Sequence, residues 1–183
     1  MTPPGKRFWP VPDTTPRIPA SNDPGSFWED RGDRRHMGID IYAPKGSRVV
    51  SIEDGTVLQT GVFTTPDLSP HWNLTNQVII AHTSGVFCRY AELHDVTVEE
   101  GSRVHGGEVI GHIGEVLNFS RVSARSPAYI RDLMAAGRSS MLHLEVYSSA
   151  PKPVFEYQGG NWFSPRKPMY IMDPALFLRE IRR

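Results

Sequence analysis

The chain has 183 residues, which is long enough for one domain with a sizeable buried core. Twenty basic and twenty acidic residues cancel, and the sequence pI is about 7.1, so the chain lacks the basic footprint of proteins that bind nucleic acid or anionic membranes. No stretch approaches the roughly 18 apolar residues that a membrane span requires. We therefore expect neither a nucleic-acid partner nor a membrane span.

The start of the chain, residues 1–10, lacks the apolar core of a secretory signal. Three explanations stay open: the protein works inside the cell, it is exported by another route, or a leader is missing from this sequence. The single cysteine, Cys88, excludes an intrachain disulfide and leaves the redox compartment open. These features by themselves assign no location.

The chain divides into a proline-rich beginning and a β-rich body. Seven of the sixteen prolines fall within the first 24 residues, which predicts that residues 1–30 form an extended segment packed on or near a body of residues 31–183. In the body, short apolar runs alternate with glycine and polar turns, as in β proteins. The predicted strands cover residues 38–42, 48–51, 55–60, 77–82, 86–92, 109–113 and 141–146.

Two stretches are predicted to be helical. The first is an inserted helix over residues 127–136, with Ser126 as its N-cap and Gly137 at its end. The second follows Asp173 as N-cap, with Pro174 at its first position and an inward face made of Leu176, Phe177 and Ile181. The expected fold is mostly β, a compact antiparallel sheet or sandwich with one inserted short helix and a C-terminal helix.

The stretch His36-Met37-Gly38-Ile39-Asp40 places a histidine and a carboxylate four residues apart. In an ideal strand two such positions lie about 13 Å apart, too far to bind one metal ion. The chain must therefore bend between them, and Gly38 is the residue that tolerates a bend or bulge. A flat strand here would contradict the assignment of both residues as ligands.

A second histidine, His143, lies in the strand-like run of residues 141–146. Strand alternation directs Leu142, Leu144 and Val146 to the core and places His143 on the opposite face with Met141 and Glu145. A lone histidine in such a run is commonly a hydrogen-bonded structural residue. Together with His36 and Asp40, however, it completes the two imidazoles and one carboxylate of a catalytic zinc site, which leaves a fourth position for water. We therefore expect Zn2+ bound by His36, Asp40 and His143.

A third element contains Tyr90, Glu92 and His94, which are expected to project together from a strand end. Water that attacks a carbonyl needs a base to accept its proton, and Glu92 is the candidate. The alternative is that Glu92 is an exposed strand-end glutamate. His94 is a candidate for orienting substrate or stabilising the oxyanion, or else an exposed loop histidine, and His112 is a weaker candidate that faces a cleft.

In this order, these residues resemble the lysostaphin-type (LytM-like) zinc metalloendopeptidases, which cut peptide cross-links in bacterial peptidoglycan. The resemblance covers residues 36–147 and depends on four motifs in the family's order and spacing. They are His36-Met37-Gly38-Ile39-Asp40, Tyr90-Ala91-Glu92-Leu93, the run from Gly101 to Gly111, and Met141-Leu142-His143-Leu144-Glu145-Val146.

Carried over by motif, the family's zinc ligands fall on His36, Asp40 and His143. The departures fall on the two histidines that the family uses around the water and the oxyanion, where this chain has Glu92 and Met141. An alternative register would make Glu145 the third ligand. We reject it because the residues after His143 match those that follow the second histidine of the family's His-x-His motif.

The resemblance also implies a long substrate groove over one face of the sheet. The insertion, residues 118–140, is then expected beside the groove, where it would shape specificity. The tail, residues 151–172, is expected to pack on the body rather than to form part of a site. The same resemblance implies a cell-wall or other extracytoplasmic location and peptidoglycan as the substrate.

Two functional hypotheses follow from the replaced histidines. In the favoured one, Glu92 replaces a histidine as general base and the protein is a zinc-dependent endopeptidase that acts on peptidoglycan stem peptides or cross-bridges. In the other, the domain binds zinc without catalysis and binds cell wall or regulates a partner hydrolase. A third class, a lipoyl-carrier-like module, is suggested by paired glycine-valine turns, but the chain offers no suitable lysine at a tight turn.

Overall fold

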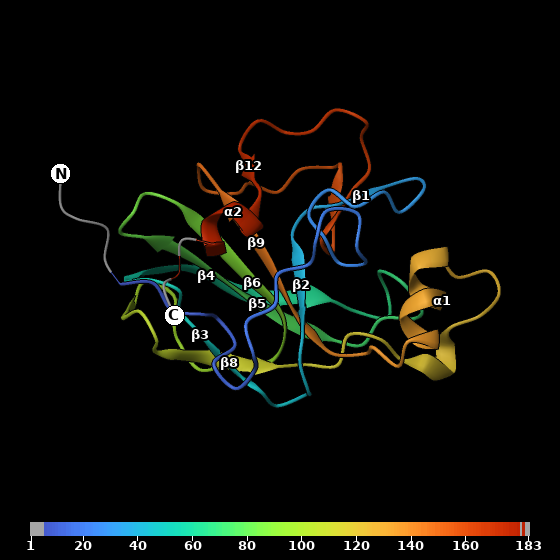
Figure 1. Cartoon of the computed structure of the whole chain (residues 1–183), viewed down its shortest axis with the longest axis horizontal. Coiled ribbons are helices and arrows are strands. Elements are labelled where there is room, and N and C mark those ends of the chain that lie inside the picture. The colour runs from blue at the N-terminus through green and yellow to red at the C-terminus, as the bar shows by residue number, and fades with distance from the viewer. Residues whose placement is uncertain (1–5, 180, 182–183) are drawn as a thin grey trace.

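The computed structural model describes residues 6–179 and 181, and it is mostly antiparallel β-sheet with few helices, as predicted (Figure 1). Residues 1–5 of the proline-rich segment and residues 180 and 182–183 at the other end lie outside the described residues. No helix in the described part of the chain has the length and apolar character needed to span a bilayer.

One main sheet and one small sheet hold the strands. The main sheet runs in the order β12 (Ile171–Met172), β9 (Met141–Tyr147), β6 (Phe87–Val96), β5 (Thr75–His82), β4 (Gly55–Thr64) and β7 (Arg103–Val104). In addition, β2 (Ile39–Tyr42) pairs with β9, and β8 (Val109–Ile113) pairs with β6 and with β3 (Arg48–Val50). The small sheet contains β1 (Arg35–His36), β11 (Asn161–Trp162) and β10 (Tyr157–Gln158).

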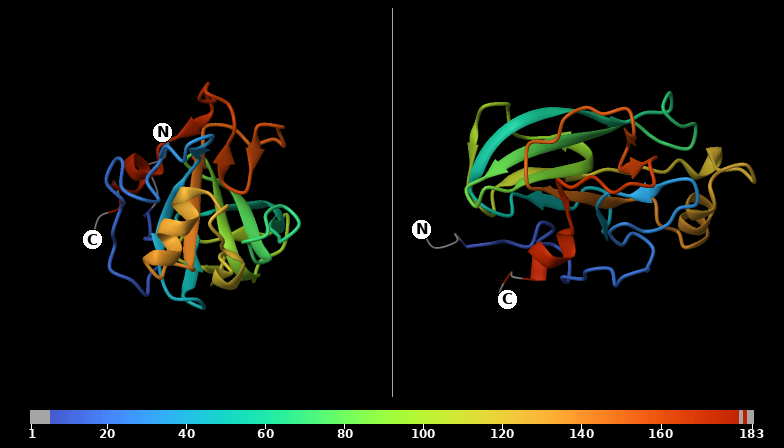
Figure 2. Two further views of the ribbon diagram at one scale, coloured as in Figure 1. Left: turned by 90° about the vertical axis from the view of Figure 1, so that its right-hand side faces the viewer. Right: turned by 90° about the horizontal axis from the view of Figure 1, so that it is seen from above.

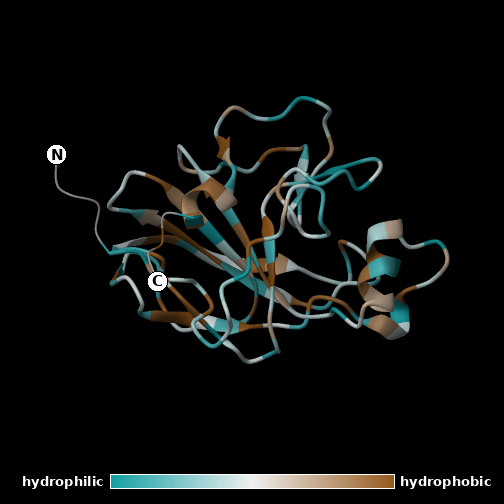
Figure 3. Cartoon of the chain, in the orientation of Figure 1, coloured by the Kyte–Doolittle hydropathy of each residue, from teal (hydrophilic) through white to brown (hydrophobic). Residues whose placement is uncertain are grey.

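The main core lies on one face of the central strands. Leu142, Leu144 and Val146 of β9 point into it, as the alternation predicts, and Figure 3 shows that the apolar residues concentrate along these strands. The helix α2 (Pro174–Arg179) and the proline-rich segment lie on the same side of the sheet (Figure 2). Val11 of that segment is fully buried in the core, so this part of the segment is held against the body.

The C-terminal helix has the predicted cap but a different inward face. The Asp173 carboxylate accepts a hydrogen bond from the backbone N–H of Ala175 at 2.8 Å, which confirms the N-cap. Leu176, predicted to face inward, is 60% exposed, and Leu178 is buried beside Phe177 instead. The prediction of Leu176 was wrong because the buried face contains Pro174 and the positions three and four residues later, Phe177 and Leu178, whereas Leu176 lies two residues after Pro174 and points away from that face.

The inserted helix α1 (Ala128–Ala135) forms where it was predicted, but Ser126 does not cap it. Its N-cap position is Pro127, which offers no side-chain acceptor, while the Ser126 hydroxyl accepts a hydrogen bond from the backbone N–H of Ser123. Gly137 ends the helix with a φ of 65°, a left-handed conformation that favours glycine. A short 3-10 turn, Phe119–Arg121, precedes the helix. The helix α1 lies at the end of the molecule opposite β3 and α2 (Figure 1).

Candidate metal centre

The chain bends between His36 and Asp40, as the ligand assignment requires. β1 ends at His36 and β2 begins at Ile39, and Gly38 lies in the break between them. A Cβ at Gly38 would lie 2.3 Å from the Leu144 carbonyl oxygen of β9, so a larger residue there would force β2 away from β9. The bend brings His36 Nε2 to 3.2 Å from Asp40 Oδ1.

The register of β2 and β9 brings His143 to the same place. His143 lies directly opposite Asp40 in the ladder, and its Nδ1 is 3.0 Å from both Asp40 Oδ1 and His36 Nε2. One ligand atom of each residue lies within 4.8 Å of those of the other two, and all three residues are buried. The structure therefore brings together the three predicted ligand residues, from strands that are far apart in the sequence.

Outer hydrogen bonds orient the two imidazoles. His36 Nδ1 lies 2.8 Å from the carbonyl oxygen of Ser26, to which it must donate, and this leaves a lone pair on Nε2. His143 Nε2 lies 2.9 Å from the Glu145 carboxylate, which leaves Nδ1 as its inward nitrogen. Two nitrogen lone pairs and a carboxylate oxygen thus converge when both rings are neutral. This donor set fits a tetrahedral Zn2+ ion. Metal-binding histidines usually donate their other ring N–H to a backbone carbonyl or a carboxylate, as His36 and His143 do here.

Glu145 lies behind His143 rather than among the converging ligand atoms. Besides His143, its carboxylate pairs with Arg89 Nη1 at 3.0 Å and accepts hydrogen bonds from the hydroxyls of Tyr157, at 2.8 Å, and Tyr147. Burial opposes its ionisation, but Arg89 and His143 together lower the pKa of Glu145 to about 2. Glu145 is therefore a buried anion that holds the His143 ring.

The electrostatics of the cluster favour a bound cation. Burial raises the pKa of Asp40, but His36, His143 and Arg31 outweigh it and hold that pKa well below its usual range. Burial lowers the pKa of His36. For His143 burial also favours the neutral form, yet hydrogen bonds with Asp40 and Glu145 raise its pKa to about 10. In the metal-free protein a proton on His143 therefore supplies the positive charge that a metal ion would otherwise bring.

Glu92 reaches this site because of a β-bulge. The register of β5 and β6 shifts at this point, and Glu92 has a φ of 65°, a conformation that is strained for a residue other than glycine. Its side chain lines a cavity of about 20 Å³ together with Asp40, Arg31 and Met141. Glu92 Oε2 is buried and has no hydrogen-bond partner among the residues that the structure describes. Burial, followed by the negative charge of Asp40, raises the pKa of Glu92 to about 8.

The bulge also separates Glu92 from its neighbours in β6. Tyr90 lies in the core, where its hydroxyl accepts a hydrogen bond from the backbone N–H of Ile52 and contacts His82 Nε2, so the expectation that Tyr90 and Glu92 project together was wrong. His94 is exposed, and His112 pairs with Asp95 at 2.8 Å. Neither His94 nor His112 lines the cavity beside Glu92, whereas Met141 does.

The tail covers the ligand cluster, contrary to the expectation that it packs away from any site. A Cβ at Gly160 would lie 2.7 Å from Cε1 of His143, so the turn between β10 and β11 lies directly on the ring. Asn161 Oδ1 accepts a hydrogen bond from Arg31 Nη1 at 3.2 Å. The only signal in the sequence was the pair Gly159-Gly160, which permits such a close backbone approach.

Arg31 is a second residue that sequence reasoning missed. Its guanidinium donates to Asp40 Oδ2 at 3.2 Å and to Glu29 Oε2 at 3.1 Å, and it lies over the ring of Tyr129 from α1. It therefore joins a metal-ligand candidate to the insertion, whose residues Ile130 and Leu133 also line the cavity beside Glu92. As expected, the insertion lies beside the site.

The fold and the His-Asp-His cluster together define a lysostaphin-like β domain with a candidate metal centre. The antimicrobial peptidase lysostaphin from Staphylococcus simulans has the same fold: the TM-score is 0.51 at 20% sequence identity, covering 80% of this chain and 44% of that one. The model of Peptidase family M23 matches residues 34–152, more than half of the chain. The chain belongs to peptidase family M23, and the predicted resemblance is confirmed.

Several curated relatives match part of the chain, and two of them represent the range of identity. The chain is 38% identical over 81 residues to the DD-carboxypeptidase/endopeptidase Mpg of Neisseria meningitidis serogroup B, covering 44% of this chain and 17% of the relative. It is 30% identical over 120 residues to the peptidoglycan DD-endopeptidase ShyA of Vibrio cholerae serotype O1, covering 64% of this chain and 25% of the relative. The match therefore spans a quarter or less of the length of each of these relatives.

Proposed function

We propose that this protein is a zinc-dependent endopeptidase that hydrolyses peptide bonds in the stem peptides or cross-bridges of peptidoglycan. The observation that carries the proposal is the convergence of His36 Nε2, Asp40 Oδ1 and His143 Nδ1 next to the buried carboxyl of Glu92. Family membership supports the peptidase activity, and the names of the two relatives support peptidoglycan as the substrate.

His36, Asp40 and His143 would hold the zinc ion. When bound, zinc would supply a Lewis acid that polarises the scissile carbonyl and makes water more acidic. Glu145 keeps His143 in the tautomer that binds metal through Nδ1, and the Ser26 carbonyl does the same for His36 Nε2. Arg31 holds the second oxygen of Asp40, which directs the first oxygen toward the histidines.

Glu92 is assigned as the general base. Its buried Oε2, to which no described residue donates a hydrogen bond, is available to accept a proton from the attacking water and later to return it to the leaving amine. Met141 has no titratable group, so it cannot replace the acid–base function of the histidine that the family has at this position. The pKa of about 8 describes the metal-free protein, and a cation bound beside Asp40 will lower it, which favours the ionised base at neutral pH.

The test compares three variants in the release of amino groups from purified peptidoglycan. Glu92→Gln should retain one zinc ion and lose activity by roughly 10²- to 10⁴-fold, because proton transfer typically contributes that much. His143→Ala should lose both the metal and the activity. Glu99→Gln, at an exposed position, is the matched control and should behave as the unmodified protein. Full activity of Glu92→Gln would refute the assignment of the base.

One observation favours the second hypothesis, a zinc-binding domain without catalysis. The cavity beside Glu92 measures about 20 Å³, and the ligand residues are at most 3% exposed, so the described conformation leaves no room for a peptide against the site. Catalysis therefore requires the turn at Gly160 or the helix α1 to move. Zinc binding with no release of amino groups from several wall types would favour the non-catalytic domain.

A further inference from the structure

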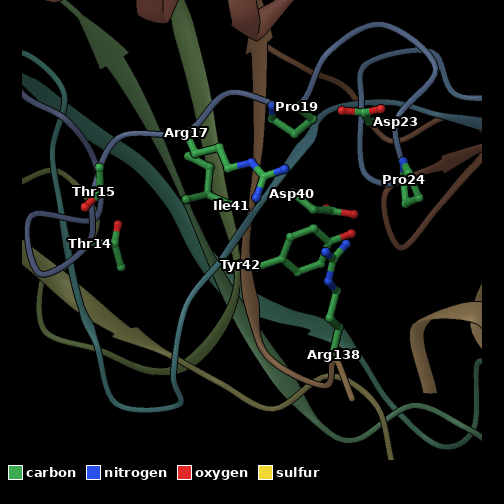
Figure 4. A pocket seen from close by; sticks show the side chains of 10 residues that line it. All are labelled: Thr14, Thr15, Arg17, Pro19, Asp23, Pro24, Asp40, Ile41, Tyr42 and Arg138. Atoms are coloured by element: carbon green, nitrogen blue, oxygen red, sulfur yellow. The ribbon is translucent and has the colours of Figure 1, made fainter. Parts of the chain in front are cut away.

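A hollow of about 400 Å³ opens beside Asp40, between the proline-rich segment and β2 (Figure 4). Asp40, Ile41 and Tyr42 of β2 line one side of it, and six residues from the stretch 14–24 line the rest together with Arg138. Its volume lies within the range of small-molecule sites, roughly 300–1,000 Å³. The hollow therefore adjoins a proposed metal ligand and is large enough for an amino-acid-sized group.

Two arginines enter the hollow from opposite sides. Arg17 comes from the proline-rich segment and Arg138 from the loop after α1, and both guanidinium groups point toward the space beside Asp40 and Tyr42 (Figure 4). The Arg138 guanidinium lies over the Tyr42 ring, 4.4 Å from its centre. Among the described residues, neither arginine has a carboxylate within ion-pair distance, unlike other arginines of this chain, namely Arg31, Arg48 and Arg89.

The acidic groups that line the hollow are engaged elsewhere. Asp40 pairs with Arg31 through Oδ2 and with both histidines of the cluster through Oδ1. Asp23 accepts a hydrogen bond from the backbone N–H of Ala20 at 3.2 Å. The hollow therefore presents two guanidinium groups that lack an anionic partner. A guanidinium binds a carboxylate through two parallel hydrogen bonds, which makes a carboxylate the best-matched ligand.

Part of the hollow is formed by residues outside the range that matches the family model. Residues 14–24 precede the part of the chain that matches the family model, and Arg138 follows the inserted helix. The hollow nevertheless adjoins the candidate site, because Asp40 lines both the hollow and the cavity beside Glu92. It shares Tyr42 and Arg138 with a smaller cavity of about 70 Å³, and that cavity shares Arg31 and Tyr129 with the one beside Glu92.

We propose that this hollow, defined by Arg17, Tyr42 and Arg138, is a subsite for a carboxylate of the peptide substrate, close to the bond that is cut. The inference rests on the proposed function, because it places a stem peptide across the metal centre. It makes a specific statement about substrate choice: stem peptides with free carboxylates bind more tightly than the same peptides with those carboxylates converted to primary amides.

The test measures binding separately from turnover. Two synthetic probes, an N-acetylated stem tetrapeptide with free carboxylates and its amidated counterpart, are titrated by calorimetry into the zinc-loaded full chain carrying Glu92→Gln, which prevents cleavage. The free-carboxylate probe should bind roughly tenfold more tightly, as expected for one or two charge-assisted hydrogen bonds at a partly solvated site. Arg17→Gln should remove most of that preference, and Arg103→Gln, an exposed arginine outside these cavities, should not.

Arg138→Lys provides a second variant that keeps the charge but loses the two parallel hydrogen bonds, so it should reduce the preference. Equal binding of both probes, or a preference unchanged in Arg17→Gln and Arg138→Lys, overturns the subsite. Turnover of peptidoglycan by the protein without the Glu92 substitution is measured in parallel. A carboxylate preference without turnover supports the subsite and refutes the peptidase, whereas turnover without a preference refutes the subsite alone.

Discussion

Glu145→Gln tests whether the buried anion behind His143 supports both the fold and the metal centre. The glutamate is fully buried, and its pKa of about 2 in the folded protein compares with an ordinary value of 4.5. At about 1.4 kcal/mol per pKa unit, the ionised carboxylate contributes about 3 kcal/mol to the free energy of unfolding at neutral pH. This agrees with the roughly 3–5 kcal/mol that is lost when one partner of a buried ion pair is removed.

The loss should appear in thermal unfolding of the metal-free protein. For a chain of this size, about 3 kcal/mol corresponds to a fall in Tm of roughly 6–12 °C. Because the pKa is lowered in the folded state, the contribution is present above pH 4.5 and is lost as the pH falls toward 2. The difference in stability between Glu145→Gln and the unmodified protein should therefore shrink over that interval.

The same substitution should weaken zinc binding by roughly 10- to 100-fold, measured by competition with a chelator, because Glu145 fixes the orientation of the His143 ring. The exposed variant Glu99→Gln is the matched control for both measurements. An unchanged Tm together with unchanged zinc affinity would refute the reasoning, since it would mean that neither Arg89 nor His143 depends on the carboxylate.

Three further predictions concern the cluster itself. Because the metal-free protein carries a proton on His143 below pH 10, zinc binding must displace that proton. The zinc affinity should therefore rise about tenfold per pH unit between pH 6 and 8. An affinity that does not change with pH would contradict the assignment of His143 as a ligand. Gly160→Ala should destabilise the protein and weaken zinc binding more than Gly46→Ala does. Gly46 is the control because it has a similar positive φ, while a Cβ there would meet no described atom within 4 Å. Equal effects of the two substitutions on stability and on zinc affinity would show that the turn does not press on His143. Gly38→Ala should lower both the Tm and the zinc affinity because the added Cβ would push β2 away from β9. Unchanged zinc binding would show that the close approach of these two strands does not set the positions of the ligands.

Local pattern was sufficient for most strands and for the candidate ligands. Alternation of apolar residues predicted β2, β5 and β9, and the four-residue spacing of His36 and Asp40 required the bend that the structure has at Gly38. These features depend on neighbours in the sequence, which is why a single sequence reveals them. The grouping of His143 with Asp40 came from the residue types that zinc requires and from the family motif, because more than a hundred residues separate the two and no local pattern connects them.

The placement of Glu92 and the covering of the site were decided by tertiary structure. A bulge in β6 turns Glu92 away from the side of Tyr90, and alternation alone predicts the opposite. The face of β9 that carries His143 was predicted to lie opposite to the apolar core face. It is buried because the turn at Gly160, the insertion and Arg31 pack over it, and such contacts between distant segments leave no periodic signal in the sequence.

The amino-acid sequence by itself therefore determined the β fold, its family and the three residues that can bind a metal, because motif spacing and strand periodicity are local properties. Only the tertiary structure decided which oxygen and nitrogen atoms converge and which carboxyl lies beside them. It also decided where a hollow opens whose two arginines have no carboxylate partner within the described part of the chain. The physical reason is that these features arise from close packing of strands, turns and loops that meet only when the chain is folded.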